Sequence, residues 1–500
     1  MFPVFHSQVP EIRRWPANEA PIRTDGEFVI YWMTANRRPT FNFSLQRAVE
    51  WAQQLQKPLL ILEALRAAYP WACQRFHRWA MDGMEANQSF FASQAVTYYP
   101  YLEPAPGDGK GLLESLAERA CVVVGDHFPC FFLPHMIEKT AARLPVRLEL
   151  VDSNGLLPLR AASKTYLRAV DFRRFLQKNL KPHLEQMPVI DPLKGVNLPS
   201  LPQVLPEYER WKPGVTFRLE GLPQPAPVTQ RGGYLRGDKL VSRFLAERLS
   251  KYDQRSQPSL EVASGFSPYL HWGHLSVHQI FTELCDAESF TLAQLSVRTP
   301  GSKEGGWGMG DNAESFLDEL VTWRELGYNM CHREDDYDRY ESLPDWARQS
   351  LEEHASDPRP QLYTLPELDQ GKTYDPLWNA AQRQLREEGV IQNYMRMIWG
   401  KKILEWSKTP REAIKNLIEL NNKYSLDGRN PNSYSGIFWC LGRYDRAWFE
   451  RPIFGKIRYM SSDSTARKFK MAGYLERFSD SLPAASRSSA RAGQTGSLFE

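Results

Sequence analysis

The hydrophobic residues of positions 1–152 fall into short, nearly continuous runs that are separated by amphipathic stretches. The runs predict β-strands at residues 28–33, 59–63, 95–99, 120–125 and 146–152. The stretches between them, such as 44–56 and 70–91, show helical periodicity. Buried strands that alternate with helices indicate an α/β domain built on a doubly wound parallel sheet, which is Rossmann-like. We expect the strand ends at Thr34 and Asp126 to line a ligand-binding crevice at the carboxyl edge of this sheet.

The pattern changes twice along the rest of the chain. Prolines cluster in residues 153–235 without clear periodicity, which predicts an interdomain connector on the surface. In residues 236–478 helical periodicity dominates, and we expect helices at 239–251, 269–285, 312–330, 376–388, 390–406 and 410–423. The second domain is therefore predicted to be all-helical. Residues 479–500 lack an apolar pattern and are expected to form a disordered tail.

Composition narrows the class of protein. The formal net charge of +3 excludes a polybasic protein but leaves room for a local basic surface. The six cysteines are scattered without ligand-like spacing, so neither a disulfide framework nor a metal site is expected, and a reducing compartment is indicated. Neither a signal peptide nor a membrane-spanning run is apparent, and we expect a cytoplasmic protein without a membrane partner.

Several of the fifteen tryptophans are placed where they could meet one another. Trp399 and Trp406 are seven residues apart in one predicted helix and therefore share a face. Trp378 opens the preceding predicted helix, just after Asp375 and a proline. These indoles are either ordinary core packing or a relay of rings that carries electrons to a buried cofactor, and spacing alone leaves both open.

Two further segments are candidate binding sites. Glu319 and Trp323 are four residues apart in a predicted helix, which suits a pocket that stacks a flat base and hydrogen-bonds its edge. A surface ion pair beside a core tryptophan would have the same spacing. Ser264, Gly265 and Ser267 precede an aromatic helix, where hydroxyl and N–H groups can hold a diphosphate or simply cap the helix.

Residues 434–460 form a predicted turn-rich region in which cations and aromatic rings alternate. The tryptophans are Trp439 and Trp448, and the arginines include Arg446, Arg451 and Arg458. Arginines hold phosphates and rings stack on bases, so the pattern favours a nucleic-acid surface over a merely solvated basic surface.

Five sequence blocks resemble the class II cyclobutane pyrimidine dimer photolyases of the photolyase/cryptochrome family. They are SPYLHWG (267–273), DPLWNAAQ (375–382), YMRMIWGKKILEW (394–406), LDGRNPNSY (426–434) and DRAWFERPIFGKIRYM (445–460). The resemblance implies an α/β antenna domain followed by a helical domain that binds FAD. It also implies a carbon–carbon lyase, monomeric, that uses light and reduced FAD (FADH⁻) to repair dimers in UV-damaged DNA. A cryptochrome-like light sensor without repair activity, or a non-enzymatic nucleotide- or nucleic-acid-binding protein, are the alternatives.

The resemblance also assigns roles to residues. The expected FAD contacts are Tyr252, Ser264, Gly265, Phe266, Ser267, Arg396, Asn421, Asp427, Gly428 and Arg429. Among these, Arg396 and Asp427 match an ion pair beside the isoalloxazine, and Asn421 matches an asparagine near flavin N5. Trp399 and Trp378, with Trp406 nearby, match a tryptophan dyad that reduces the flavin.

For the DNA, Glu319 resembles the acid that binds the base edge of the dimer. Trp323, Met397 and Trp439 resemble the apolar walls of the lesion pocket. Trp448 and Arg458 resemble residues that enter the gap left by the flipped bases. The resemblance also implies a second chromophore, an antenna of the deazaflavin type, although residues 36–45 depart from the usual sequence of the family in that region.

Overall fold

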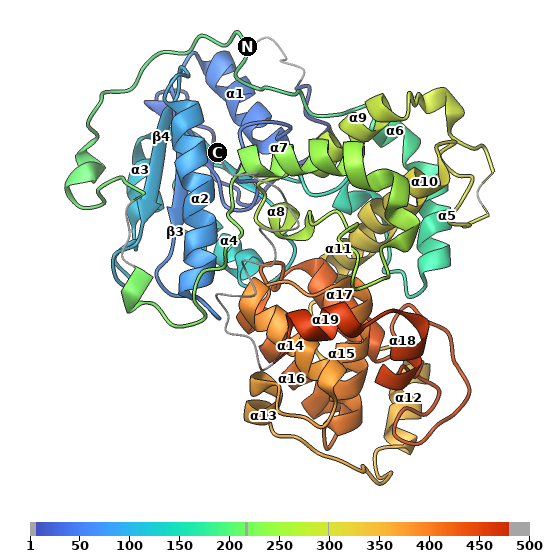
Figure 1. Cartoon of the computed structure of the whole chain (residues 1–500). Coiled ribbons are helices and arrows are strands. Elements are labelled where there is room, and N and C mark those ends of the chain that lie inside the picture. The colour runs from blue at the N-terminus through green and yellow to red at the C-terminus, as the bar shows by residue number, and fades with distance from the viewer. Residues whose placement is uncertain (1–6, 216–218, 299, 480–500) are drawn as a thin grey trace.

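A six-stranded sheet forms the N-terminal domain in the computed structural model, which describes residues 7–215, 219–298 and 300–479 (Figure 1). The strands are β1 (Arg14–Pro16), β2 (Phe28–Trp32), β3 (Leu59–Leu65), β4 (Thr97–Leu102), β5 (Ala120–Asp126) and β6 (Leu148–Val151), in the order β1-β6-β5-β2-β3-β4. Strands β2 to β6 pair in parallel, which confirms the predicted fold class. The short antiparallel strand β1 was not predicted, because three residues ending in proline show no periodicity.

Helices cover both faces of this sheet. They are α1 (Phe43–Leu55), α2 (Gln74–Phe91), α3 (Leu112–Arg119) and α4 (Leu133–Ala141). Alternate residues of β2 belong to two different cores: Phe28 and Ile30 pack in one, and Val29 and Tyr31 in the other. Because both faces are buried, the strands show nearly continuous hydrophobic runs in the sequence.

At the carboxyl edge of β2 and β5, Asp126 is bonded within the protein. The buried Asp126 carboxylate accepts hydrogen bonds from the backbone N–H groups of Thr34 (2.9 Å), Ala35 (2.8 Å) and Asn36 (2.9 Å). Asp126, which we expected to line a ligand-binding crevice, is therefore engaged by the protein's own backbone. A buried carboxylate needs several donors, and the loop after β2 supplies them.

The segment between the domains is more ordered than its prolines suggested. It contains α5 (Ala169–Asn179) and α6 (Lys181–Leu184), and α7 (Tyr234–Arg243) begins at its end. Phe172 and Leu176 of α5 are buried in the largest core cluster, and Arg173 forms an ion pair of 2.8 Å with Asp318. After α6 the chain, green in Figure 1, runs around the outside of the sheet domain past α3. The segment is thus only partly the surface connector that we predicted.

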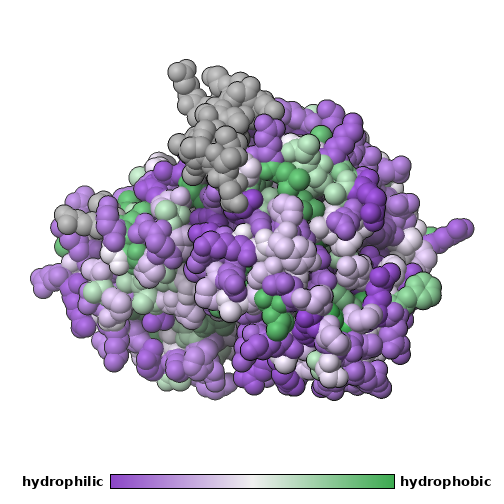
Figure 2. All heavy atoms as spheres, turned by 60° about the horizontal axis from the view of Figure 1, so that its bottom comes forward, coloured by the Kyte–Doolittle hydropathy of each residue, from purple (hydrophilic) through white to green (hydrophobic). Residues whose placement is uncertain are grey.

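The C-terminal domain is helical, as predicted. Its helices are α7, α8 (Ser267–His271), α9 (Val277–Ala287), α10 (Asp311–Leu317), α11 (Arg324–Arg333), α12 (Asp345–Glu353), α13 (Leu365–Gln370), α14 (Pro376–Glu388), α15 (Asn393–Trp406), α16 (Pro410–Tyr424), α17 (Pro431–Cys440), α18 (Ser462–Lys468) and α19 (Ala472–Arg477). Helices α13 to α19, orange to red, lie together in the lower part of Figure 1. The molecular face in Figure 2 is mainly hydrophilic, with scattered hydrophobic side chains.

Several predicted boundaries need correction. The helix expected at 269–285 is two helices, because the chain turns between α8 and α9. The helix expected at 312–330 exists but contains a π-helical turn, η8 (Asp318–Trp323), between α10 and α11. Part of the supposedly turn-rich 434–460 region is helix α17. The tail from residue 480 onward lies outside the described residues.

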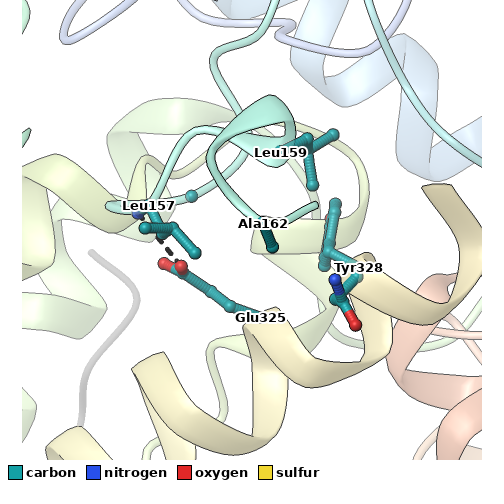
Figure 3. Close-up of a pocket in the computed structure, with 7 residues that line it drawn as sticks. Leu157, Leu159, Ala162, Glu325 and Tyr328 are labelled. Carbon is teal, nitrogen blue, oxygen red and sulfur yellow. Dashed lines mark hydrogen bonds between the residues drawn. The ribbon is translucent and has the colours of Figure 1, made fainter. Parts of the chain in front are cut away.

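A small cavity lies where the connector meets α11 (Figure 3). Its volume is about 10 Å³, which is room for about one water molecule. The Glu325 carboxylate beside it accepts hydrogen bonds from the backbone N–H groups of Leu156 (2.6 Å) and Leu157 (3.0 Å). Burial raises the pKa of Glu325 to about 7. Glu325 thus holds the connector to the helical domain, and the cavity is too small for a ligand.

The state of the cysteines and the length of the helices are the remaining features of the fold. All six cysteines are free thiols. Among the helices of residues 7–479 that the structure describes, none is long and apolar enough to cross a membrane.

Replacing Gly273 by alanine should strongly destabilise the contact between the domains. Gly273 has a φ of +70°, and an added Cβ would lie 1.8 Å from the carbonyl oxygen of Ala35. The left-handed backbone alone costs about 1–2 kcal/mol, and relief of the clash adds to this. The matched control is Gly436→Ala in α17, where an added Cβ meets open space and alanine favours the helix by roughly 0.5–1 kcal/mol. Chemical denaturation measures both variants, and equal stability of the two would contradict the prediction.

Candidate active site

An ion pair joins three segments of the helical domain. Arg396 on α15 donates to both carboxylate oxygens of Asp427, at 3.0 and 3.4 Å, in the turn after α16. The hydroxyl of Ser267, at the start of α8, donates to the same carboxylate at 2.6 Å, and that of Ser425 also donates to it. Burial by itself would raise the pKa of Asp427, but the guanidinium and the two hydroxyls hold it at about 2. Asp427 is therefore ionised at every physiological pH.

An aromatic wall stands beside the 264–267 loop. Phe244 contacts the rings of Tyr252 and Phe266, with centroid separations of 5.7 and 5.2 Å, and Phe316 closes the cluster. Gly265 has a φ of +74°, which lets the loop turn before α8 begins. The structure thus brings together Tyr252, Phe266 and Ser267, three of the expected flavin contacts.

Several polar groups at this site remain available to a ligand. Asn421 is only 3% exposed, yet among the described residues nothing donates a hydrogen bond to its Oδ1. The Tyr252 hydroxyl likewise has no hydrogen-bond partner within the described ranges. Arg396 directs only one terminal nitrogen at Asp427. This set of donors, acceptors and rings fits a flat, anionic cofactor such as FAD.

Not every residue that was expected to contact FAD points toward this site. Arg429 is buried, lies over the Phe76 ring at 3.6 Å, and donates to the backbone carbonyls of Asn422 and Ser425. Its guanidinium therefore stabilises its own loop. A Cβ at Gly428 would lie 2.9 Å from the carbonyl oxygen of Asn421, so glycine allows the turn to pack closely on α16.

Glu319 and Trp323 both lie in the π-helical turn η8. π-helical turns are rare in proteins, and those that do occur are often found at functional sites. The Glu319 carboxylate, about a third exposed, accepts from Arg255 at 3.2 Å, and burial raises the pKa of Glu319. Arg255 also lies over the Tyr252 ring at 4.7 Å, which links the acid to the aromatic wall. Arg255 was not identified from the sequence, although its position three residues after Tyr252 indicated that the two side chains could contact each other.

The three candidate relay tryptophans are in contact and almost fully buried. Trp378 and Trp399 are parallel, with planes 2° apart and centroids 6.5 Å apart, and Trp406 meets Trp378 edge-on at 5.4 Å. The Trp378 indole N–H donates to the backbone oxygen of Trp399 at 3.0 Å. That of Trp399 donates to Gln382, a partner that the sequence did not reveal, at 2.8 Å.

This array runs from the helix that carries Arg396 to the surface. Trp399 lies one helical turn after Arg396 on α15. At the other end, Trp406 contacts Tyr374, which is 62% exposed, with ring centroids 5.6 Å apart. Contiguous rings thus run from Trp399, one helical turn from Arg396, to solvent.

The basic aromatic segment is organised around Asp445. The Asp445 carboxylate accepts from the Arg458 side chain at 2.9 Å and from the Trp448 indole at 3.3 Å. The Arg458 guanidinium lies over Trp448 at 4.2 Å and over Trp439 at 5.6 Å. Trp439 and Met397 are both half-buried, and α17 packs against α15 through Cys440, whose thiol contacts the Met397 carbonyl oxygen. Arg451 instead lies over Tyr459 at 5.1 Å.

A solved structure shares this arrangement of domains. The crystal structure of a bacterial class III photolyase from Agrobacterium tumefaciens superposes with a TM-score of 0.66. The alignment covers 91% of this chain and 86% of that chain at 17% identity, so it shows the fold. An α/β domain followed by this helical domain defines a protein with the photolyase fold.

Sequence relatives give the family itself. The chain is 33% identical over 470 residues to a deoxyribodipyrimidine photo-lyase of Methanothermobacter thermautotrophicus, covering 93% of this chain and 97% of the relative. Enzymes with the same name from Arabidopsis thaliana (32%, covering 89% and 88%) and Potorous tridactylus (30%, covering 93% and 83%) also match. No family model matches. The chain belongs to the deoxyribodipyrimidine photo-lyase family, whose members are lyases, and photolyase function is favoured over light sensing alone.

Proposed function

We propose that the protein is a class II cyclobutane pyrimidine dimer photolyase that binds FAD in its helical domain and repairs UV-damaged DNA in the light. The observation that carries the proposal is the parallel pair Trp378 and Trp399. One turn from it lies the largely buried Arg396–Asp427 ion pair, with unused hydrogen-bonding groups around it. Core packing explains buried indoles, but not their continuity from an anionic cofactor site to a solvent-exposed tyrosine.

In this proposal each group of residues has a separate role. FAD, bound in its reduced form, would supply on excitation the electron that opens the cyclobutane ring and would take it back once the two pyrimidines are restored. Arg396 holds positive charge beside the cofactor, and Asp427 fixes the orientation of Arg396. Tyr252 and the 264–267 loop bind the rest of the cofactor. Trp399, Trp378 and Trp406 connect it to solvent for reduction.

The lesion site is assigned to the other side of the cofactor. Glu319 hydrogen-bonds the base edge of a dimer that has left the duplex, and Trp323, Met397 and Trp439 form apolar walls. Extruding a dimer costs only a few kcal/mol, since its bases are already badly stacked. The cations around Trp448 hold the DNA backbone.

Two measurements on the full-length protein test the proposal. The absorption spectrum of the purified protein should contain the bands of a flavin, and a deazaflavin antenna would add a band of its own. Under blue light, the reduced protein should restore pyrimidines in a dimer-containing oligonucleotide. A flavin-containing protein that repairs nothing would support the light-sensing alternative, and a colourless one would overturn the proposal.

Glu319→Ala should lower repair about 10- to 100-fold, which corresponds to the loss of one strong hydrogen bond. Flavin content should change far less, because Glu319 lies at the lesion side. The raised pKa of Glu319 keeps the carboxyl neutral, and so able to donate, to a higher pH than in an exposed glutamate. Repair should therefore decline as pH rises through that pKa, whereas Glu319→Gln should lack this dependence. Loss of FAD from Glu319→Ala would contradict the assignment.

A further inference from the structure

Another small cavity, about 10 Å³ in volume, lies between the two domains. Asn36 and Arg38, in the loop after β2, line it from the α/β domain. Arg324 and Tyr328 of α11 line it from the helical domain. The surface that faces its interior is almost entirely polar, and its volume has room for one species about as large as a water molecule. The cavity therefore suits a very small polar or charged ligand.

The two arginines that line the cavity are buried and have unused hydrogen-bond donors. Arg38 is 2% exposed and Arg324 is 6% exposed. Among the described residues neither guanidinium forms an ion pair, and neither Nε of Arg38 nor Nη1 of Arg324 has a hydrogen-bond acceptor. Burial lowers the pKa of Arg38 to about 10, and the charge of Arg324 adds to this effect, but Arg38 is still protonated at neutral pH. Buried charges of this kind are costly unless a partner compensates them.

Both guanidinium groups are held in place by their other nitrogens. Arg38 donates to the backbone oxygens of Gly273 (3.1 Å) and Phe41 (3.2 Å). Arg324 donates to the Tyr328 hydroxyl at 3.1 Å and lies over the ring of the same tyrosine at 4.3 Å. The unused donors are thus preorganised, which lowers the entropy cost of binding a ligand.

The nearby carboxylates compensate these charges only in part. Asp126 is engaged with the N–H groups of the loop after β2, and Asp152 lies 3.9 Å from another buried arginine, Arg13. Glu325 follows Arg324 on α11, but burial raises its pKa to about 7, so this acid is only partly ionised at neutral pH. Positive charge is therefore in excess around the cavity, which favours an anionic ligand.

We infer that this cavity is an anion site that binds one chloride ion between Arg38 and Arg324. A water molecule accepts the same N–H groups but leaves the two charges uncompensated. Phosphate, sulfate and carboxylates are too large for the cavity, whereas chloride is only slightly larger than water. None of the residues that line the cavity was assigned to FAD, the relay or the lesion, so the site goes beyond the proposed function. Bound chloride connects the loop after β2 to α11 and stabilises the contact between the domains.

Urea denaturation of the full-length protein tests the site, with sodium chloride exchanged for sodium gluconate at constant ionic strength. Gluconate is too large for the cavity. Chloride should raise the urea midpoint of the wild type until the effect saturates, since a ligand at 100 times its dissociation constant shifts the unfolding equilibrium about 100-fold. Arg324→Met, which removes one of the two cations, should lose this response. The matched control is Arg66→Met, which removes an exposed arginine after β3 and should respond as the wild type does.

Bromide gives a second readout that needs no variant. Wild-type crystals soaked in sodium bromide should show an anomalous-scattering peak between Arg38 and Arg324, because bromide occupies halide sites and scatters anomalously. A wild-type urea midpoint that is the same in chloride and gluconate would overturn the anion site, and a bromide peak in that case would mean binding at crystal concentration only. A chloride response that Arg324→Met retains in full, or crystals without the peak, would overturn it as well.

Discussion

Asp427→Asn should destabilise the helical domain by about 3 kcal/mol, because it leaves Arg396 without its partner in a largely buried site. The asparagine side chain has the same shape, but it brings no charge and accepts fewer hydrogen bonds. Asp427 accepts bonds from Arg396, Ser267 and Ser425, so the substitution affects all three segments. We also expect the flavin content of the purified protein to fall about tenfold or more, since one charge-assisted hydrogen bond contributes roughly 1.5–3 kcal/mol.

Chemical denaturation and the ratio of flavin to protein absorbance measure the two effects. The matched control is Glu341→Gln, which removes the same charge from an exposed ion pair with Arg411 and should change neither quantity. A normal flavin content and stability in Asp427→Asn would show that the ion pair does not organise the site. The low pKa of Asp427 also sets the direction in which its contribution to stability changes with pH. The stability that this carboxylate contributes is present above the ordinary aspartate range and is lost only as pH falls toward about 2.

Trp399→Phe should lose most of the photoreduction of oxidised flavin, since the ring next to the proposed cofactor site would be a poorer electron donor. Repair by protein that has been chemically reduced beforehand should remain close to that of the wild type. The substitution also leaves the buried Gln382 oxygen without its donor, so a stability loss of about 1–3 kcal/mol is expected. Flash photolysis of the oxidised protein, and repair by the prereduced protein, separate the two functions.

Trp51→Phe is the control for loss of an indole. Trp51 lies in α1 of the α/β domain, where it packs against Arg47, and has no contact with the relay tryptophans. It should photoreduce normally. If prereduced Trp399→Phe repaired no dimers, the relay role of Trp399 would be wrong, and the tryptophan would have to act in repair itself.

The sequence pattern was most informative where structure depends on close neighbours. The predicted strands match β2 to β6 within a few residues, since hydrophobic runs between helices are set by burial on both faces. The start of α14 was also foreseen, because Asp375 accepts hydrogen bonds from the N–H groups of Leu377 and Trp378, as an N-cap should. Helix α5 was missed, because the prolines that follow it obscured its own amphipathic pattern.

The residues of the candidate site were predicted from the sequence, largely through the family resemblance, but their geometry was not. Neither Arg255 beside Glu319 nor Gln382 beneath Trp399 was identified, because each is joined to its partner only by folding. The same holds for Asp126, which accepts hydrogen bonds from the loop after β2.

The sequence by itself determined the order of domains, most helices and strands, and the blocks that resemble the photolyases. Only the tertiary structure decided that Trp378 lies parallel to Trp399, that Arg429 stabilises its own loop, and that Arg38 and Arg324 line one cavity between the domains. The physical reason is the distance along the chain over which each effect acts. Propensity and periodicity act between residues a few positions apart, whereas ring contacts, ion pairs and exposure depend on how distant segments pack together.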